Sequence, residues 1–246
     1  MLTAVVQGRI FPEDTPRVVF NLLQTSFVNK VIVSCWEGEE FNFDDSRVTV
    51  VKNTPPEIAG ITNRNMQIVS SRGGISGVTT PYAAKFRSDQ IISVDSLEMM
   101  NRFRLKFESE KRIFVCGDFS LPFHPRDHVY WGRTDDVKEL FDIPLDPIPA
   151  PPGEHYDIYV RSETYIAQFY YARRDTRVAA MVDEPRRYLV DGAPEYHRAL
   201  ALSNELRDKY FHVFPRIQLD WPKHGIYGYR YDSQSVWERW YDEPWE

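Results

Sequence analysis

The chain of 246 residues contains only two cysteines, Cys35 and Cys116, and no long hydrophobic run. Two cysteines are too few for a disulfide framework or a zinc site, so we interpret both as buried free thiols. No apolar stretch approaches the roughly 20 residues that span a bilayer. The N-terminus also lacks the basic and apolar regions of a signal peptide. We therefore expect a cytoplasmic protein without a transmembrane segment, for which peripheral membrane contact is still allowed.

Basic charge is scarce as well. The chain has 30 Lys and Arg residues against 36 Asp and Glu residues, for a net charge of −6 at pH 7. A broad nucleic-acid interface needs a basic face that neutralises phosphates, so this balance argues against a nucleic-acid partner. A phosphate-loop lysine motif and a dinucleotide-binding fingerprint are both missing.

Short β-type runs alternate with helical patterns through the first half of the chain. The expected strands are Thr3–Val6, Val31–Cys35, Val48–Lys52, Tyr82–Arg87, Ile113–Cys116 and Val129–Trp131. The expected helices are one capped by Thr15, then Asn63–Gly74, Ser96–Phe107 and Asp135–Phe141. This alternation predicts an α/β fold with a layered, largely parallel sheet.

A proline cluster interrupts this pattern between Pro144 and Pro152. Because proline lacks a backbone donor, we expect residues 144–153 to form an extended surface connector. The connector separates an α/β half, residues 1–143, from a mostly helical part, residues 154–246. A single integrated domain remains the alternative. The last segment, from Trp221 to Trp245, is rich in aromatic rings that suit either sugar stacking or packing against the domain.

Three charged residues share one face of an expected strand. Side chains alternate between the faces of a strand, so Lys85, Arg87 and Asp89 point the same way. Such a row is costly in a sheet interior unless the charges meet a ligand or each other. Asp89 also stands near the carboxyl end of the strand, where open α/β sheets bind ligands. The row therefore indicates either an anion and metal site or an internal ion-pair network.

Polar residues of two other segments suit nucleotide contacts. The block before the charged strand contains Arg64, Asn65, Gln67 and Arg72, whose amides and guanidinium groups can bind a base, ribose or phosphate. The same residues also fit a polar helix face. The first strand ends at Gln7-Gly8, where glycine allows a close backbone approach or simply a turn.

Two carboxylates outside these segments are candidate catalytic groups. Asp127 follows His124-Pro125-Arg126 in a loop whose spacing matches no zinc signature. Glu163 follows Ser162, a good helix N-cap, so the helix dipole is a sufficient reason for its carboxylate. It can equally point across a cleft at an acceptor hydroxyl.

Several of these segments, in this order, resemble the WavE family of lipopolysaccharide and capsule synthesis proteins. The segments are Val5–Gly8, Val33–Trp36, Asn63–Ser70, Lys85–Asp89, His124–Asp127, Trp131-Gly132 and Glu163–Tyr165. The resemblance implies a GT-A-type glycosyltransferase fold that binds a nucleotide-diphosphate sugar donor and a glycan or polysaccharide acceptor.

The resemblance also assigns roles to residues. It places donor contacts at Gln7, Gly8, Lys85 and Arg87, and Mg²⁺ or Mn²⁺ at Asp89. The Asp-x-Asp metal motif of the fold is degenerate here, because Arg87 replaces its first acid. Met66 likewise stands where an arginine is expected, so donor contacts differ there. Glu163, ahead of Asp127, is the candidate base for the acceptor proton if the reaction inverts the anomeric centre.

Two other functions compete with sugar transfer. A sugar nucleotidyltransferase usually carries a glycine-rich basic loop after its first strand, and residues 8–13 lack that glycine content. A non-catalytic carbohydrate-binding protein derived from a transferase would account for the degenerate metal motif and the aromatic tail.

Overall fold

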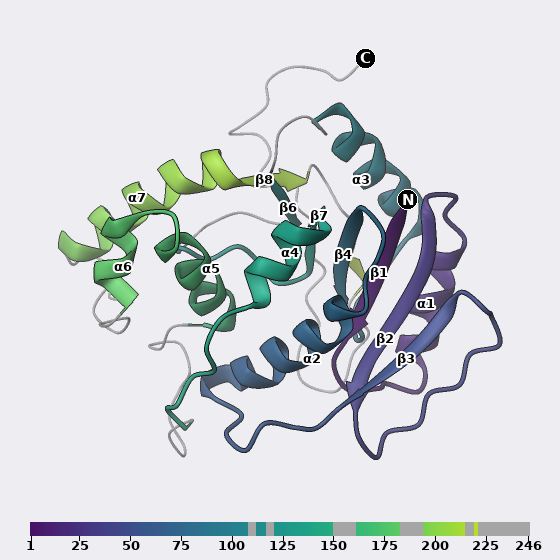
Figure 1. Cartoon of the computed structure of the whole chain (residues 1–246). Helices are drawn as coiled ribbons and strands as arrows, with labels where there is room; N and C mark the ends of the chain where they lie inside the picture. Colours follow the sequence, from purple (N-terminus) through teal and green to yellow (C-terminus); the bar gives the residue numbers. More distant parts are fainter. Residues whose placement is uncertain (108–111, 117–120, 150–160, 183–193, 215–218, 221–246) are drawn as a thin grey trace.

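The computed structural model describes the chain except residues 108–111, 117–120, 150–160, 183–193, 215–218 and 221–246. Its centre is a seven-stranded sheet with helices on both faces (Figure 1). In spatial order the strands are β3 (Val48–Asn53), β2 (Val28–Trp36), β1 (Leu2–Gln7), β4 (Tyr82–Arg87), β7 (Val129–Arg133), β6 (Ile113–Cys116) and β8 (Phe211–Phe214). A separate two-stranded sheet pairs β5 (Ile91–Ile92) with β9 (Leu219–Asp220).

The main sheet is largely parallel, as predicted. Strands β3, β2, β1 and β4 run parallel to one another, and β6 pairs in parallel with β8. Strand β7 is antiparallel to both of its neighbours, β4 and β6. Because it is reversed, β7 begins at the edge where β1 and β4 end.

Two hydrophobic cores cover the two faces of the sheet. Along β1, Val5 faces the core shared with α2, α4 and α5, whereas Ala4 and Val6 face the core shared with α1 and α3. This alternation follows from the period of two in a strand. The helices are α1 (Asp14–Leu23), α2 (Arg64–Ser76, preceded by the 3-10 turn η1, Ile61–Asn63), α3 (Val94–Lys106), α4 (Thr134–Phe141), α5 (Ser162–Ala172), α6 (Thr176–Val182) and α7 (Pro194–Tyr210).

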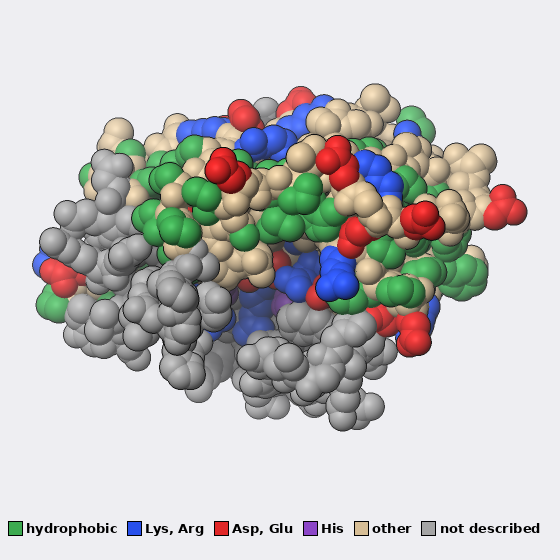
Figure 2. All heavy atoms as spheres, turned by 90° about the horizontal axis from the view of Figure 1, so that it is seen from below, with side chains coloured by type: hydrophobic (Ala, Val, Ile, Leu, Met, Phe, Trp, Pro, Cys, Tyr) green, Lys and Arg blue, Asp and Glu red, His purple; other side chains and the backbone are tan. Residues whose placement is uncertain are grey.

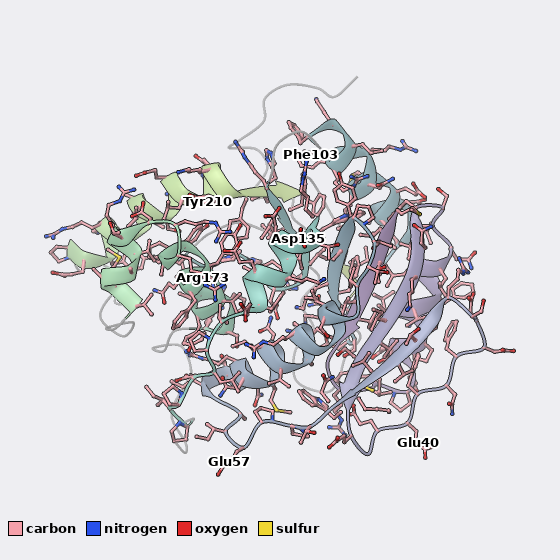
Figure 3. The ribbon with its side chains drawn as sticks, viewed as in Figure 1. Glu40, Glu57, Phe103, Asp135, Arg173 and Tyr210 are labelled. Carbon is pink, nitrogen blue, oxygen red and sulfur yellow. The ribbon has the colours of Figure 1, made fainter. Side chains whose placement is uncertain are left out.

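All six predicted strands lie within strands of the main sheet. The first helix begins at Asp14 instead of after a cap at Thr15, and the Thr15 hydroxyl lies inside it, accepting a hydrogen bond from the Phe11 N–H. Strand β8 was not predicted. It extends the sheet beyond β6, and the ring centroids of Phe214 and Phe103 lie 5.8 Å apart. Figure 3 shows Phe103 on α3.

The second part of the chain packs closely on the first. Tyr165, Ile166 and Tyr171 of α5 share one core with Val5 and Ile68 of the first half. Residues 144–149 form neither helix nor strand and are mostly exposed. The rest of the expected connector and the aromatic tail lie outside the described residues. Within the described parts of the chain, no helix is long and apolar enough to cross a membrane.

Helix α2 approaches the sheet through two glycines. A Cβ at Gly74 would lie 2.4 Å from Val5 Cγ1 and 2.8 Å from Ser34 Cβ, and one at Gly73 would lie 1.8 Å from Asn53 Oδ1. Contacts this short require the helix, the strand or the contacted side chains to move. The glycines therefore set how closely α2 packs over the ends of β1 to β3.

We expect Gly74→Ala to lower the free energy of unfolding by about 1–3 kcal/mol, the usual cost of an overpacked core. Denaturant unfolding at equilibrium measures this. The matched control is Gly77→Ala at the end of the same helix, where a Cβ makes only ordinary contact at 3.5 Å. That control should be neutral or slightly stabilising. Equal destabilisation by both variants would contradict the close-packing explanation.

Candidate active site

A cleft of about 260 Å³ lies where the end of β4, the η1 turn and the start of α5 come together. Its lining residues are Thr62, Gln67, Arg87, Asp127, Arg161, Ser162 and Glu163. In the view from below, Figure 2 shows basic side chains gathered in a hollow of the surface. The cleft combines four charged side chains with small polar groups, a composition suited to a charged ligand.

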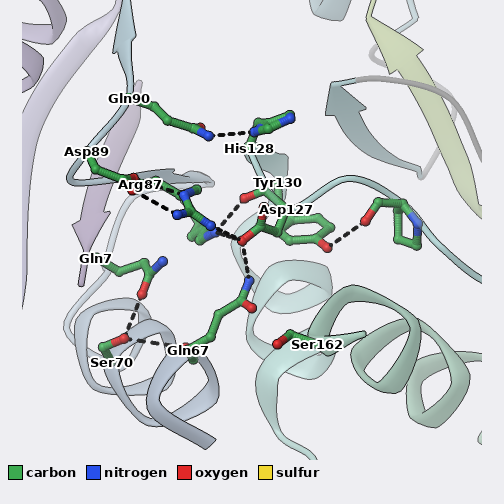
Figure 4. A network of polar contacts seen from close by, with 12 residues as sticks. Gln7, Gln67, Ser70, Arg87, Asp89, Gln90, Asp127, His128, Tyr130 and Ser162 are labelled. Atoms are coloured by element: carbon green, nitrogen blue, oxygen red, sulfur yellow. Dashed lines mark hydrogen bonds and ion pairs between the residues drawn. The ribbon is translucent and has the colours of Figure 1, made fainter. Parts of the chain in front are cut away.

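Asp127 is the centre of the polar network beside the cleft (Figure 4). Its Oδ2 atom accepts hydrogen bonds from Arg87 at 2.8 Å and from Gln67 at 3.1 Å. Lys85 Nζ lies 3.9 Å from the same oxygen and donates to the backbone carbonyl of Asp127 at 2.5 Å. Arg87 also donates to both carboxylate oxygens of Asp89, at 2.9 and 2.8 Å. The two cations of β4, Lys85 and Arg87, are thus paired with the carboxylates of Asp127 and Asp89.

Burial and the neighbouring charges together set the pKa values in this network. Lys85 is fully buried, and burial lowers its pKa to about 8, although Asp127 opposes the change. Burial acts to raise the pKa of Asp127, but Arg87 and Lys85 overcome it and hold that pKa well below its usual range. Asp127 is therefore a permanently charged anchor for two cations and a poor proton acceptor near pH 7.

The pKa of Glu163 is raised, in contrast to that of Asp127. Burial, and then the charge of Asp127, raise the pKa of Glu163 to about 7, while its own backbone N–H, Arg87 and Lys85 act to lower it. Glu163 lines the cleft, and its carboxylate accepts a hydrogen bond from its own backbone N–H. A carboxylate with a pKa near the working pH is well matched to proton transfer.

Gln7 and Gly8 lie at the end of β1, close to this network. The Ser70 hydroxyl of α2 donates to Gln7 Oε1 at 2.6 Å, which holds the side-chain amide in place. Gly8 has a φ of +122°, and a Cβ there would lie 2.9 Å from Ser88 Oγ, so glycine is required. Both residues stay close to the end of β4, as a shared donor site would need.

Three of the predicted donor-binding residues lie away from the cleft, namely Arg64, Asn65 and Arg72. The Arg64 guanidinium lies 3.2 Å from Asp146 Oδ2 and over the ring of Tyr165. The side chain of Asn65 exchanges hydrogen bonds with the backbone of Asp146 at 2.8 Å, and Arg72 donates to carbonyls of residues 141 and 143. None of the three lines the cleft. They hold the segment after α4 against α2.

Three lining residues were not among the predicted site residues: Thr62, Arg161 and Ser162. Ser162 was expected to cap α5, but the cap position is Arg161, and Ser162 instead hydrogen-bonds the Thr62 hydroxyl at 2.9 Å. Thr62 has a φ of +54°, which is strained for a β-branched residue and invisible in the sequence. A sequence signal did exist for Arg161, because a cation at a helix N-terminus is disfavoured by the dipole.

The metal site expected at Asp89 does not fit the residues present. Both carboxylate oxygens of Asp89 accept hydrogen bonds from Arg87, which already brings a positive charge to that point. Among the described residues, no three His, Cys, Asp or Glu side chains are grouped so that they could hold a metal ion. Asp89 is therefore an ion-pair partner of Arg87, and Mg²⁺ or Mn²⁺ at this carboxylate stays a prediction.

Comparison with known families shows to which family the chain belongs. The model of the WavE lipopolysaccharide synthesis family matches residues 3–150, more than half of the chain. The chain belongs to this family. The match includes Lys85, Arg87, Asp89 and Asp127 but ends before Glu163. A search of the curated proteins finds no match.

Solved structures with a partial likeness to this chain have low sequence identity to it. S. aureus TarS 1-349 has a TM-score of 0.45 and 12% identity over 84% of this chain and 71% of that chain. A longer TarS chain has a TM-score of 0.45 and 10% identity over 86% of this chain, which spans only 44% of it. Francisella tularensis 2-C-methyl-D-erythritol 4-phosphate cytidylyltransferase has a TM-score of 0.38 and 10% identity, covering 57% of this chain and 76% of that chain.

Proposed function

We propose that this protein is a GT-A-type glycosyltransferase that moves a sugar from a nucleotide-diphosphate donor to a lipopolysaccharide or related surface-glycan acceptor. The observation that carries the proposal is that Arg87 and Glu163 line the same cleft, and that the pKa of Glu163 is about 7. Membership of a lipopolysaccharide synthesis family supports the substrate class. We place the reaction in the cytoplasm, at the surface of the membrane that holds the growing glycan.

In this proposal the donor lies over the ends of β1 and β4, near Gln7, Gly8, Lys85 and Arg87. Fixed cations stabilise the negative charge that develops on the leaving nucleoside diphosphate. Glu163 takes the proton of the acceptor hydroxyl as that oxygen attacks the anomeric carbon, so the displacement inverts the anomeric centre. Asp127 stays charged, holds Arg87 in place and keeps the pKa of Glu163 high.

The experiment that tests the function is incubation of the protein with labelled nucleotide sugars and a lipopolysaccharide-type acceptor. Release of a nucleoside diphosphate with labelling of the acceptor supports sugar transfer. Release of pyrophosphate from a nucleoside triphosphate and a sugar phosphate would show a nucleotidyltransferase instead. Binding of glycan without any turnover would show the non-catalytic alternative.

The role of Asp127 predicts a change in pH dependence. Glu163 must be deprotonated to accept a proton, so the rate should rise with pH through about 7. In Asp127→Asn the neighbouring negative charge that raises the pKa of Glu163 is gone, so this limb should move to lower pH. Initial rates between pH 5 and 9 measure the shift, and an unmoved limb would contradict the coupling. In Glu163→Gln the residual activity should lack the limb altogether.

A further inference from the structure

The charge balance of the cleft singles out one cation. Arg87 and Lys85 already face carboxylates, Asp89 and Asp127, at 2.8 to 3.9 Å. Arg161 lines the same cleft and is exposed. Within the described parts of the chain its guanidinium has no hydrogen-bond or ion-pair partner. Arg161 is thus the lining cation whose charge no described carboxylate offsets.

The position of Arg161 is unfavourable for stability alone. It precedes the first residue of α5, where the helix dipole favours anions over cations. The other charged residue at this helix start, Glu163, does satisfy the dipole. A cation that is disfavoured by its own helix and lacks a protein partner is well placed to meet an anionic ligand.

We propose that Arg161 binds the diphosphate of the donor from the α5 side of the cleft and supplies positive charge that a divalent cation would otherwise supply. This inference rests on the proposed sugar transfer. It also explains why Asp89 can pair with Arg87. If a guanidinium group supplies the positive charge, no carboxylate is needed to hold a metal ion. Arginine suits this task, since its planar fork can bind phosphate oxygens in pairs.

The chemical step balances without a metal. The bond between the anomeric carbon and the diphosphate oxygen breaks, and its electron pair stays on the diphosphate. The acceptor oxygen forms the new glycosidic bond, and its proton passes to Glu163. The negative charge that appears on the diphosphate is met by the guanidinium group of Arg161.

The test is calorimetric binding of UDP, GDP, CDP and ADP to the whole protein, each in EDTA and in MgCl₂. The nucleotide that binds best should bind with similar affinity in both buffers. Arg161→Ala should weaken it at least about tenfold, as expected for loss of a charge-assisted hydrogen bond. Arg161→Lys should recover part of the loss. The nucleoside monophosphate with the same base should be affected much less, because it lacks the outer phosphate.

Arg102→Ala is the matched control. Arg102 is an exposed arginine of α3 that does not line the cleft, so its loss should leave all affinities unchanged. Binding that requires Mg²⁺, or an Arg161→Ala variant with unchanged affinity, would overturn the inference while leaving sugar transfer intact. Failure of all four nucleotides to bind in either buffer would overturn the proposed function and this inference with it.

Discussion

Replacing Glu163 by Gln is expected to lower the turnover number for sugar transfer by about 10²–10⁴-fold, the usual contribution of a general base. The variant keeps the size of the side chain and much of its hydrogen bonding but cannot take up the acceptor proton. The affinity for donor nucleotide should change little, because Glu163 acts on the acceptor side. Steady-state rates with saturating donor and acceptor measure the effect.

Glu195→Gln is a closely matched control. Glu195 is the second residue of α7, as Glu163 is of α5, and it is exposed to solvent. Both substitutions remove a first-turn carboxylate and its favourable interaction with a helix dipole. Only the change at Glu163 should slow transfer. If both variants turn over at the wild-type rate, Glu163 is a helix-end residue and the reaction proceeds without this base.

The largest expected effect on stability belongs to Asp127→Ala. The substitution leaves Lys85, which is fully buried, and Arg87 without the carboxylate that they share. Removal of one partner from a buried ion pair typically costs about 3–5 kcal/mol, because the remaining charge has been taken out of water. Chemical denaturation at pH 7 measures the loss of unfolding free energy.

Asp142→Ala provides the comparison for this measurement. Asp142 is paired with Arg173 at 3.9 Å, but its side chain is 81% exposed, so its loss should change stability by less than about 0.5 kcal/mol. The wild-type protein should also lose the contribution of Asp127 in acid. Because the pKa of Asp127 is lower in the folded state, this contribution is complete above roughly pH 4 and falls away below it. Similar losses in both alanine variants would contradict the role of Asp127 as a buried anchor.

Local patterns were sufficient to predict most of the fold. The apolar run Ile113–Cys116 coincides with β6, as expected of a strand that is buried on both faces. Strand β8 escaped prediction for a physical reason. Its four residues follow α7 without a turn signal, and only pairing with β6 makes Phe211–Phe214 a strand.

The candidate site was less predictable because it depends on contacts between distant segments. Alternation predicted that Lys85, Arg87 and Asp89 share a face, and left open whether they meet a ligand or each other. The answer depends on Asp127, some 40 residues further along the chain, which no local pattern connects to Arg87. Arg64 illustrates the reverse case: it has the chemistry of a phosphate ligand, but Asp146 and Tyr165 surround it.

The outer position of β8 has a consequence for the protein during its synthesis on the ribosome. Until residues 211–214 emerge, β6 has no partner on one side, and such an open edge can pair with other chains. At about 5–20 residues per second, roughly 3–13 s separate the end of the family match at residue 150 from the arrival of β8. During that interval we expect the open edge of β6 to be accessible to chaperones. A fragment that stops at residue 150 would remain in that state permanently and should aggregate.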